Sequence, residues 1–166
     1  MKSNLLKNFS VDKENARVNV EREFVAPVGK VWAAWTQSEL LDQWWAPKPW
    51  KARTKSHDFR EGGTWLYAMV GPEGEEHWAK VDYKTVDPQK SFSALDAFCD
   101  ENGTDNPEFA KSLWTNTFSE ADGRTTVSVL IQYDKYEDIE VIMQMGFEEG
   151  FTMALGNLDE VLEEQS

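Results

Sequence analysis

The order of the sequence patterns is the feature that most constrains the fold. From residue 51 to residue 133, short strand-forming stretches alternate with turn signals such as Gly62-Gly63 and Ala121-Asp122-Gly123. One helical pattern then runs from about Glu137 to Glu164. An antiparallel sheet with one apolar face needs a cover, and only this last segment is long enough to supply it. We therefore expect a curved sheet wrapped around a long C-terminal helix.

Two short helices are predicted after the first strand of that sheet. Residues 16–25 alternate apolar and polar side chains, as a half-buried strand does. Apolar residues then recur at helical spacing over 28–35, and a second helical pattern covers 38–45 before Pro47 and Pro49 end it. The expected fold class is α+β, with an antiparallel sheet of about six to seven strands.

A chain of 166 residues fits one domain. Residues 1–14 are polar and aperiodic, which predicts a flexible N-terminal arm ahead of a domain over residues 15–166. Leu5-Leu6 is the only apolar pair in that arm, too short for a signal peptide, and the longest apolar run, Val31–Trp35, is too short to enter a membrane.

The charge balance excludes some classes of partner. Asp and Glu number 30 against 17 Lys and Arg, a net charge of −13, which disfavours nucleic acid and anionic lipid. Residues 137–166 contain no Lys or Arg, so they form either a solvated acidic face or a surface for a basic partner. The single cysteine, Cys99, permits no internal disulfide, and we expect a buried thiol and a cytoplasmic location.

Acid–base candidates are few. Asp96 lies between apolar residues of a predicted strand, where burial would raise the pKa of its carboxyl, and His77 and Tyr67 are the other candidates for proton transfer. His57 and Asp58 are neighbours in a strand and should point to opposite faces. Neither histidine has a ligand partner at metal-binding spacing, and phosphate-binding loops and nucleophile elbows are absent from the sequence. We therefore predict no metal site and no cofactor.

Small residues suggest an unfilled interior. Small side chains alternate with cations over 51–56, and Gly146, Gly150 and Ala154 recur along the predicted terminal helix. Such residues either leave room for a ligand or let the helix approach the sheet closely, and the aromatic residues around them either line a pocket or fill a core. Trp44-Trp45 with Pro47 is a candidate pocket mouth, and residues 100–111 are a candidate lid. The predicted ligand-pocket residues are Trp45, Trp65, Tyr67, Met69, His77, Trp114, Phe118, Phe147, Gly150, Phe151 and Ala154.

Four runs in collinear order carry a family resemblance: REFVAPVGKVWAAWTQSELLDQWWAPKPW, DFREGGTW, AMVGPEGEEHW and MGFEEGFTMALGNLDEVL. Over roughly residues 15–163 the chain resembles the heat-shock protein 90 ATPase activator-like family, a branch of the START-related helix-grip superfamily. The resemblance implies a helix-grip fold with an internal cavity for an apolar or amphipathic ligand.

Three functions follow as hypotheses. The first is binding of a small lipophilic or aromatic ligand without covalent chemistry, by a monomer or homodimer. The second, implied by the resemblance, is a co-chaperone-like module that stimulates a chaperone ATPase in a stress response; the co-chaperone that names the family has a further N-terminal domain, which residues 1–14 cannot supply. The third is a cyclase- or hydrolase-like enzyme that uses Asp96, His77 or Tyr67.

Overall fold

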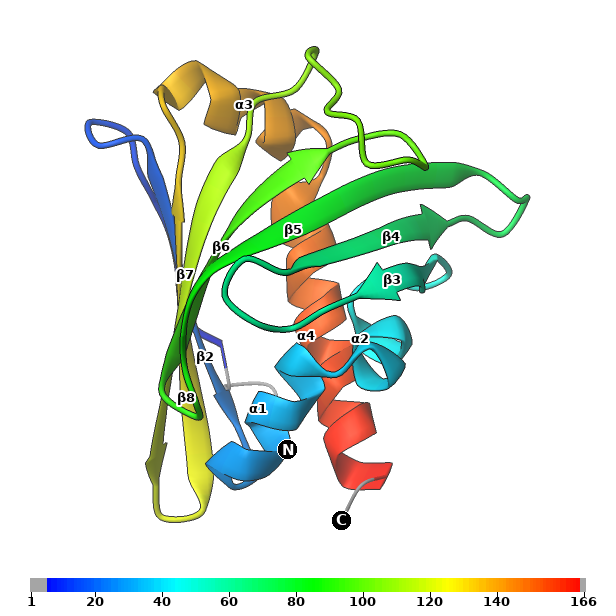
Figure 1. The fold of residues 1–166 in the computed structure, drawn as a ribbon. Coiled ribbons are helices and arrows are strands. Elements are labelled where there is room, and N and C mark those ends of the chain that lie inside the picture. Colours follow the sequence, from blue (N-terminus) through cyan, green and yellow to red (C-terminus); the bar gives the residue numbers. More distant parts are fainter. Residues whose placement is uncertain (1–5, 165–166) are drawn as a thin grey trace.

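The computed structural model describes residues 6–164, which form one antiparallel eight-stranded sheet and four helices (Figure 1). The strand order across the sheet is β1-β2-β8-β7-β6-β5-β4-β3. The elements are β1 Leu6–Asp12, β2 Arg17–Phe24, α1 Val28–Thr36, α2 Ser38–Trp44, β3 Lys51–His57, β4 Thr64–Val70, β5 Glu76–Asp87, β6 Ser91–Phe98, β7 Ser112–Ala121, β8 Arg124–Gln132, α3 Tyr136–Gln144 and α4 Phe147–Glu164.

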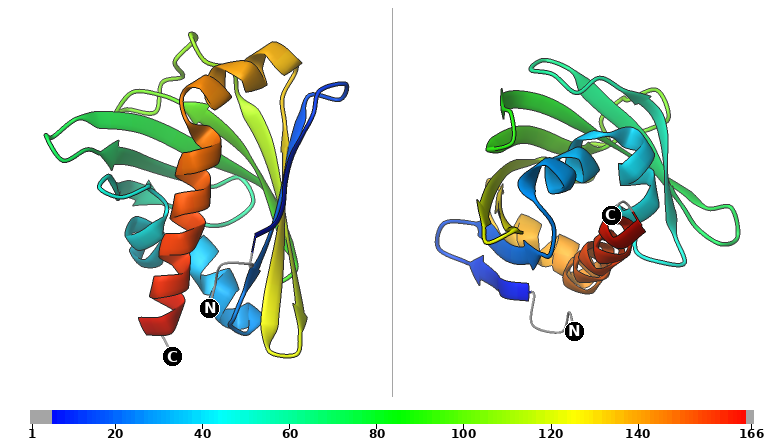
Figure 2. Two further views of the ribbon diagram at one scale, coloured as in Figure 1. Left: turned by 180° about the vertical axis from the view of Figure 1, so that it is seen from behind. Right: turned by 90° about the horizontal axis from the view of Figure 1, so that it is seen from below.

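The sheet curves around the helices, and α4 crosses its open side (Figure 2). Tight turns connect the long twisted strands. At the β7–β8 turn, Asp122 and Gly123 both have positive φ, 55° and 75°, the backbone that matches the right-handed twist of two paired strands. The predicted α+β helix-grip class is confirmed.

The first strand, β1, corrects the prediction of a flexible arm. Residues 6–12 pair with β2 along the edge of the sheet, where Phe9 lies opposite Val20. The ring of Phe9 also packs against Phe147 at 6.2 Å between centroids. Backbone hydrogen bonds and one aromatic contact therefore order a segment whose polar side chains show no strand pattern. Residues 1–5 lie outside the described residues.

The predicted terminal helix is two helices, so the prediction of one helix over 137–164 is wrong at one point. Helix α3 ends at Gln144, and Gly146 has a φ of 87°, a left-handed conformation that glycine adopts without a Cβ clash. The chain changes direction there, and α4 begins at Phe147. Gly146 therefore does not continue a helical stripe with Gly150 and Ala154.

A buried ion pair joins the sheet to α4. Arg22 of β2 points inward with Val20 and Phe24, and its two terminal nitrogens donate to the two carboxylate oxygens of Asp159 at 2.9 and 2.6 Å. Both residues are only 7% exposed. Asp159 therefore does not belong to the acidic surface expected of residues 137–166, because Arg22 is buried directly opposite it.

Aromatic rings fill the half of the interior next to α1. Trp32 of α1 makes edge contacts with Phe59, Phe92 and Phe118 at 5.9, 5.7 and 5.1 Å between centroids. Trp44 of α2 is fully buried and donates its Nε1–H to the carbonyl of Ala34. This half of the space between sheet and helices is a packed core. None of the helices in residues 6–164 is long and apolar enough to cross a membrane.

Candidate functional site

A pocket of about 370 Å³ occupies the other half of the interior, beneath α3 and the first turns of α4. Its walls come from the inward faces of β4, β5, β6 and β7, from the segment after α2 and from both C-terminal helices. The lining residues are Trp45, Pro47, Trp50, Tyr67, Met69, His77, Ala79, Asp96, Phe98, Ala110, Ser112, Trp114, Tyr133, Ile142, Met145, Gly146, Phe147, Gly150 and Phe151.

The apolar wall consists mainly of rings that contact one another. Trp114 lies 5.8 Å from Trp45 and 5.5 Å from Phe151 between centroids. Phe147 and Phe151, one turn apart on α4, stack at 5.3 Å with an angle of 13° between their planes. Gly150 lies between them in sequence and adds no side chain, so this part of α4 leaves volume open. The aromatic rings of α4 therefore form one wall of the pocket, and the missing side chain at Gly150 leaves space beside them.

Asp96 is the carboxylate of this pocket. It follows Phe92 and Ala94 on the inward side of β6, and it lies opposite Ser112 of β7 and Val81 of β5 in the sheet. No described side chain or backbone group donates a hydrogen bond to its carboxyl, and burial raises its pKa to about 7. It is not fully enclosed, and the surface that it keeps belongs to the pocket wall.

A second, smaller cavity of about 30 Å³ lies on the core side of Asp96, which lines both spaces. Trp35 and Asn116 also line it, and the Nε1 of Trp35 and the Oδ1 of Asn116 are buried without a hydrogen-bond partner. A space of this size is wide enough for a water molecule, which would give such polar atoms a partner. Asp96 therefore lies between the larger pocket and a small, mainly apolar cavity that contains two unpartnered polar atoms.

Two tyrosines flank the carboxylate. The hydroxyl oxygen of Tyr67 accepts the Nε1–H of Trp45 at 2.8 Å, and burial, with a further contribution from Asp96, raises its pKa well above 10. Burial also raises the pKa of Tyr133 to about 12, although a hydrogen bond with Ser112 partly offsets this increase. Both phenols therefore stay protonated at neutral pH, and the hydroxyl of Tyr67 keeps its own proton available to donate.

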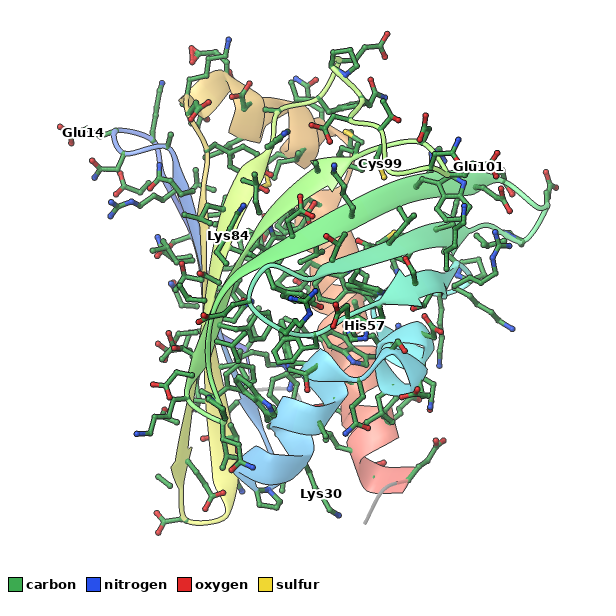
Figure 3. The ribbon with its side chains drawn as sticks, viewed as in Figure 1. Glu14, Lys30, His57, Lys84, Cys99 and Glu101 are labelled. Carbon is green, nitrogen blue, oxygen red and sulfur yellow. The ribbon has the colours of Figure 1, made fainter. Side chains whose placement is uncertain are left out.

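The two histidines occupy different environments, and neither pairs with Asp96. His77 is exposed at the rim of the pocket, where its ring lies 5.3 Å from Trp50. His57 shares a hydrogen bond of 3.0 Å with the hydroxyl of Tyr83, and burial lowers its pKa. His57 and the exposed Lys84 lie on opposite faces of the sheet (Figure 3). Within residues 6–164, no group of three or more His, Cys, Asp or Glu side chains could hold a metal ion.

The structure brings together most of the residues predicted for the ligand pocket. Trp45, Tyr67, Met69, His77, Trp114, Phe147, Gly150 and Phe151 all line the larger space. Trp65, Phe118 and Ala154 do not. Trp65 lines the smaller cavity and donates its Nε1–H to Thr54, Phe118 belongs to the packed core around Trp32, and Ala154 is buried on the apolar face of α4.

The small residues of β3 leave no open volume, contrary to expectation. Helix α2 packs against this strand, and the hydroxyl of Thr54 donates to Asp42 of α2 at 2.6 Å while it accepts from Trp65. Ala52 is buried, and neither residue lines the pocket. The short side chains of β3 therefore admit a helix rather than a ligand.

The loop of residues 100–111 is held by ion pairs. Asp105 lies 2.6 Å from Lys80 of β5 and 2.6 Å from Lys111, and these contacts lower its pKa to about 2. Ala110 is the one residue of this loop that lines the pocket. A lid role for the loop stays a prediction. Cys99 at its start is half-buried, and burial raises the pKa of its thiol to about 11.

Sequence reasoning missed two polar wall residues, Ser112 and Tyr133, although the strand pairing contains the signal. Ser112 shares its inward direction with Trp114 two residues later, and it lies directly opposite Asp96. Tyr133 continues the inward alternation of Val129 and Ile131 just beyond the end of β8. Period-two alternation identifies their face, but only the register between strands shows that they meet.

Comparisons with known proteins agree with this architecture. Residues 25–163 match the profile of the family described as Activator of Hsp90 ATPase homolog 1-like protein. The chain belongs to this family. The resemblance inferred from the four sequence runs is thereby confirmed. No curated protein matches the chain.

Solved structures share the fold over nearly the whole chain. A protein from Mycobacterium smegmatis is 31% identical with a TM-score of 0.87, over 95% of this chain and 96% of its own. A protein from Arthrobacter aurescens is 29% identical with a TM-score of 0.90, over 95% and 92%. One from Nitrosomonas europaea is 25% identical with a TM-score of 0.79, over 93% and 98%. The fold of this chain is therefore shared by proteins from three other organisms.

Proposed function

We propose that the protein binds a small lipophilic or aromatic molecule in the pocket beneath α3 and α4, without forming a covalent bond to it. The observation that carries this proposal is the pocket itself, about 370 Å³ with mainly apolar walls. Sites for small molecules have volumes of roughly 300–1,000 Å³, apolar linings and a few polar groups that orient the ligand. Asp96, Tyr67, Ser112 and Tyr133 are such groups here.

The walls are built to stay open. Trp45 donates its indole N–H to Tyr67, and it packs against Trp44 at 5.2 Å and Trp65 at 5.6 Å. Trp114 donates its indole N–H to Ser112 at 3.1 Å. These hydrogen bonds and ring contacts restrain the rings of the wall, and a preformed site loses less conformational entropy when a ligand binds.

A proton-transfer reaction is the second candidate, and one observation favours it. A carboxyl with a pKa of about 7 in a pocket can both accept and release a proton at neutral pH. His77 would have to reach it from the rim, and Tyr67 already accepts a hydrogen bond from Trp45. This hypothesis predicts a pH-dependent turnover that the Asp96→Asn variant loses. Stimulation of a chaperone ATPase, the activity in the family's description, stays a prediction that a salt-sensitive pull-down would test.

The test of ligand binding uses the whole chain. Native mass spectrometry of freshly purified protein, followed by organic extraction, should find a co-purifying small molecule, and titration with a library of lipophilic compounds should change the tryptophan fluorescence in a saturable way. Trp45 is the expected reporter, because it lines the pocket and contacts five other rings among the described residues.

A filled variant makes the assignment specific. A Cβ on Gly150 would lie 3.6 Å from Pro47, an ordinary contact, so Gly150→Leu should fold and project its side chain into the pocket. We expect it to lose binding at least about tenfold, since the leucine occupies ligand volume. Gly156→Ala, at a helical position outside the pocket, should bind as the wild type does. No bound molecule and no response to the library in the wild type would refute the proposal.

A further inference from the structure

The charges around the pocket are one-sided. Asp96 is the one Asp, Glu, Lys or Arg among the described residues that line it. Lys80 comes from the adjacent strand β5, but it follows the inward-facing Ala79 and points to the other face, where it pairs with Asp105 at 2.6 Å. A ligand with a carboxylate or phosphate would therefore find no counter-charge in the pocket and would face the carboxyl of Asp96.

The carboxyl of Asp96 also lacks a donor of its own. Neither of its nearest polar neighbours in the wall donates to it: Ser112 accepts from Trp114 and bonds to Tyr133, and Tyr67 accepts from Trp45 and keeps its own proton free. A carboxylate away from bulk water is costly unless it is paired and hydrogen-bonded. The protein supplies an acceptor to which no described group donates, so a ligand that carries a donor can complete it.

The walls next to Asp96 suit a particular kind of partner. Trp45, Trp114 and Tyr67 present aromatic rings to the same space as the carboxylate. Ring faces attract an ammonium group, and so does a carboxylate, whereas a metal ion would need further oxygen or nitrogen ligands. Among residues 6–164, no three His, Cys, Asp or Glu side chains lie close enough together to hold a metal ion. The carboxylate of Asp96 and the aromatic rings therefore both favour an organic cation as the ligand.

From this arrangement we infer that the pocket selects an organic ammonium, a molecule with an aromatic or alicyclic body and one protonated amine that pairs with Asp96. The inference rests on the proposed function and specifies its ligand class. The amine donates to the carboxylate, the hydroxyl of Tyr67 is within the same wall for a second polar group of the ligand, and the body fills the space between the rings of α4 and the sheet. Burial raises the pKa of Asp96 to about 7, and a bound cation would lower it again.

The experiment compares three probes of one shape. Naphthalen-2-ylmethylamine carries an ammonium, naphthalen-2-ylmethanol a neutral hydroxyl and 2-naphthoic acid a carboxylate. Calorimetry on the full chain at neutral pH should show the amine binding at least about tenfold more tightly than the alcohol, the range expected for a charge-assisted hydrogen bond, and the acid binding most weakly. In Asp96→Asn, the amine should lose about tenfold while the alcohol changes less than about twofold.

The outcomes separate the inference from the function. Unchanged affinity for the alcohol would show that the pocket of Asp96→Asn is intact. As a control, Asp87→Asn removes an exposed carboxylate at the last residue of β5 and should leave the affinities for all three probes unchanged. Equal binding of amine and alcohol, or an amine affinity that Asp96→Asn does not reduce, would overturn the ammonium inference and leave the container intact. Absence of binding by all three probes would also overturn it, and the lipophilic library then decides whether the proposed function survives.

Discussion

Replacing Asp96 by Asn should stabilise the ligand-free protein at alkaline pH and should do so less and less as the pH falls. The pKa of this carboxyl rises from an ordinary value of 3.8 to about 7 because folding removes it from water. Between these two pH values, the folded protein holds a proton that the unfolded chain has already released. The free energy of unfolding of the wild type therefore falls as the pH rises through this window, and the loss is complete above pH 7.

The magnitude follows from the same two values. The difference between 3.8 and about 7 corresponds to about 4 kcal/mol at pH 8, taken as an upper value. The asparagine has no charge to desolvate, but its amide is a buried polar group and costs about 1–2 kcal/mol at every pH. That constant cost does not change with pH, so the difference in unfolding free energy between Asp96→Asn and the wild type should move by up to about 4 kcal/mol in favour of the variant between pH 4 and pH 8.

Urea denaturation followed by tryptophan fluorescence at pH 4, 5, 6, 7 and 8 measures this difference. Other carboxylates titrate in the same range, but their contributions cancel when the variant is compared with the wild type at each pH. Asp87→Asn makes the same chemical change at an exposed position and should give a difference that does not vary with pH. A difference for Asp96→Asn that stays flat from pH 4 to pH 8 would show that the carboxyl is not desolvated, and the reasoning about its environment would fail.

Further predictions concern the ion pair and the glycines of the C-terminal helices. Arg22→Met should destabilise the fold by about 3–5 kcal/mol, because it leaves the buried Asp159 carboxylate unpaired, and adding Asp159→Leu should recover most of this loss. Glu160→Gln, which removes an exposed ion pair with Lys48, should change thermal stability by less than about 1 kcal/mol. Gly146→Ala should destabilise by about 1 kcal/mol or more because its φ is 87°, whereas Gly156→Ala should stabilise by up to about 1 kcal/mol. Equal effects of the two glycine changes would contradict the helix break.

The regular elements were predictable because their side chains repeat with the period of the structure. Period-two alternation located β2 and the strands from β3 to β8, and the apolar repeat of α4 located its buried face. The edge strand β1 was not predictable in this way, since backbone pairing with β2 rather than side-chain burial orders it. The break at Gly146 was also hidden, because a glycine within a helical pattern has the same letter whether it continues the helix or ends it.

The sequence pattern contained a signal for the buried ion pair between Arg22 and Asp159. Asp159 follows Leu155 by four residues and precedes Leu162 by three, so it occupies an apolar position of α4, and Arg22 does the same between Val20 and Phe24 of β2. One charge of each sign at apolar positions predicts a pair, although only the fold shows that β2 and α4 meet. The same limit applies to the polar wall of the pocket, where strand register brings Ser112 opposite Asp96.

The two halves of the interior differ for a reason that links stability to function. Next to α1, large rings interlock and leave only a cavity of about 30 Å³. Beneath α3 the chain places Gly150 between Phe147 and Phe151 and a carboxylate on a facing strand, and the pocket there measures about 370 Å³. A leucine at Gly150 would improve helix propensity and fill apolar volume, so the filled variant should be at least as stable as the wild type while it loses ligand. A residue that lowers stability and keeps a space open is best explained by what enters that space.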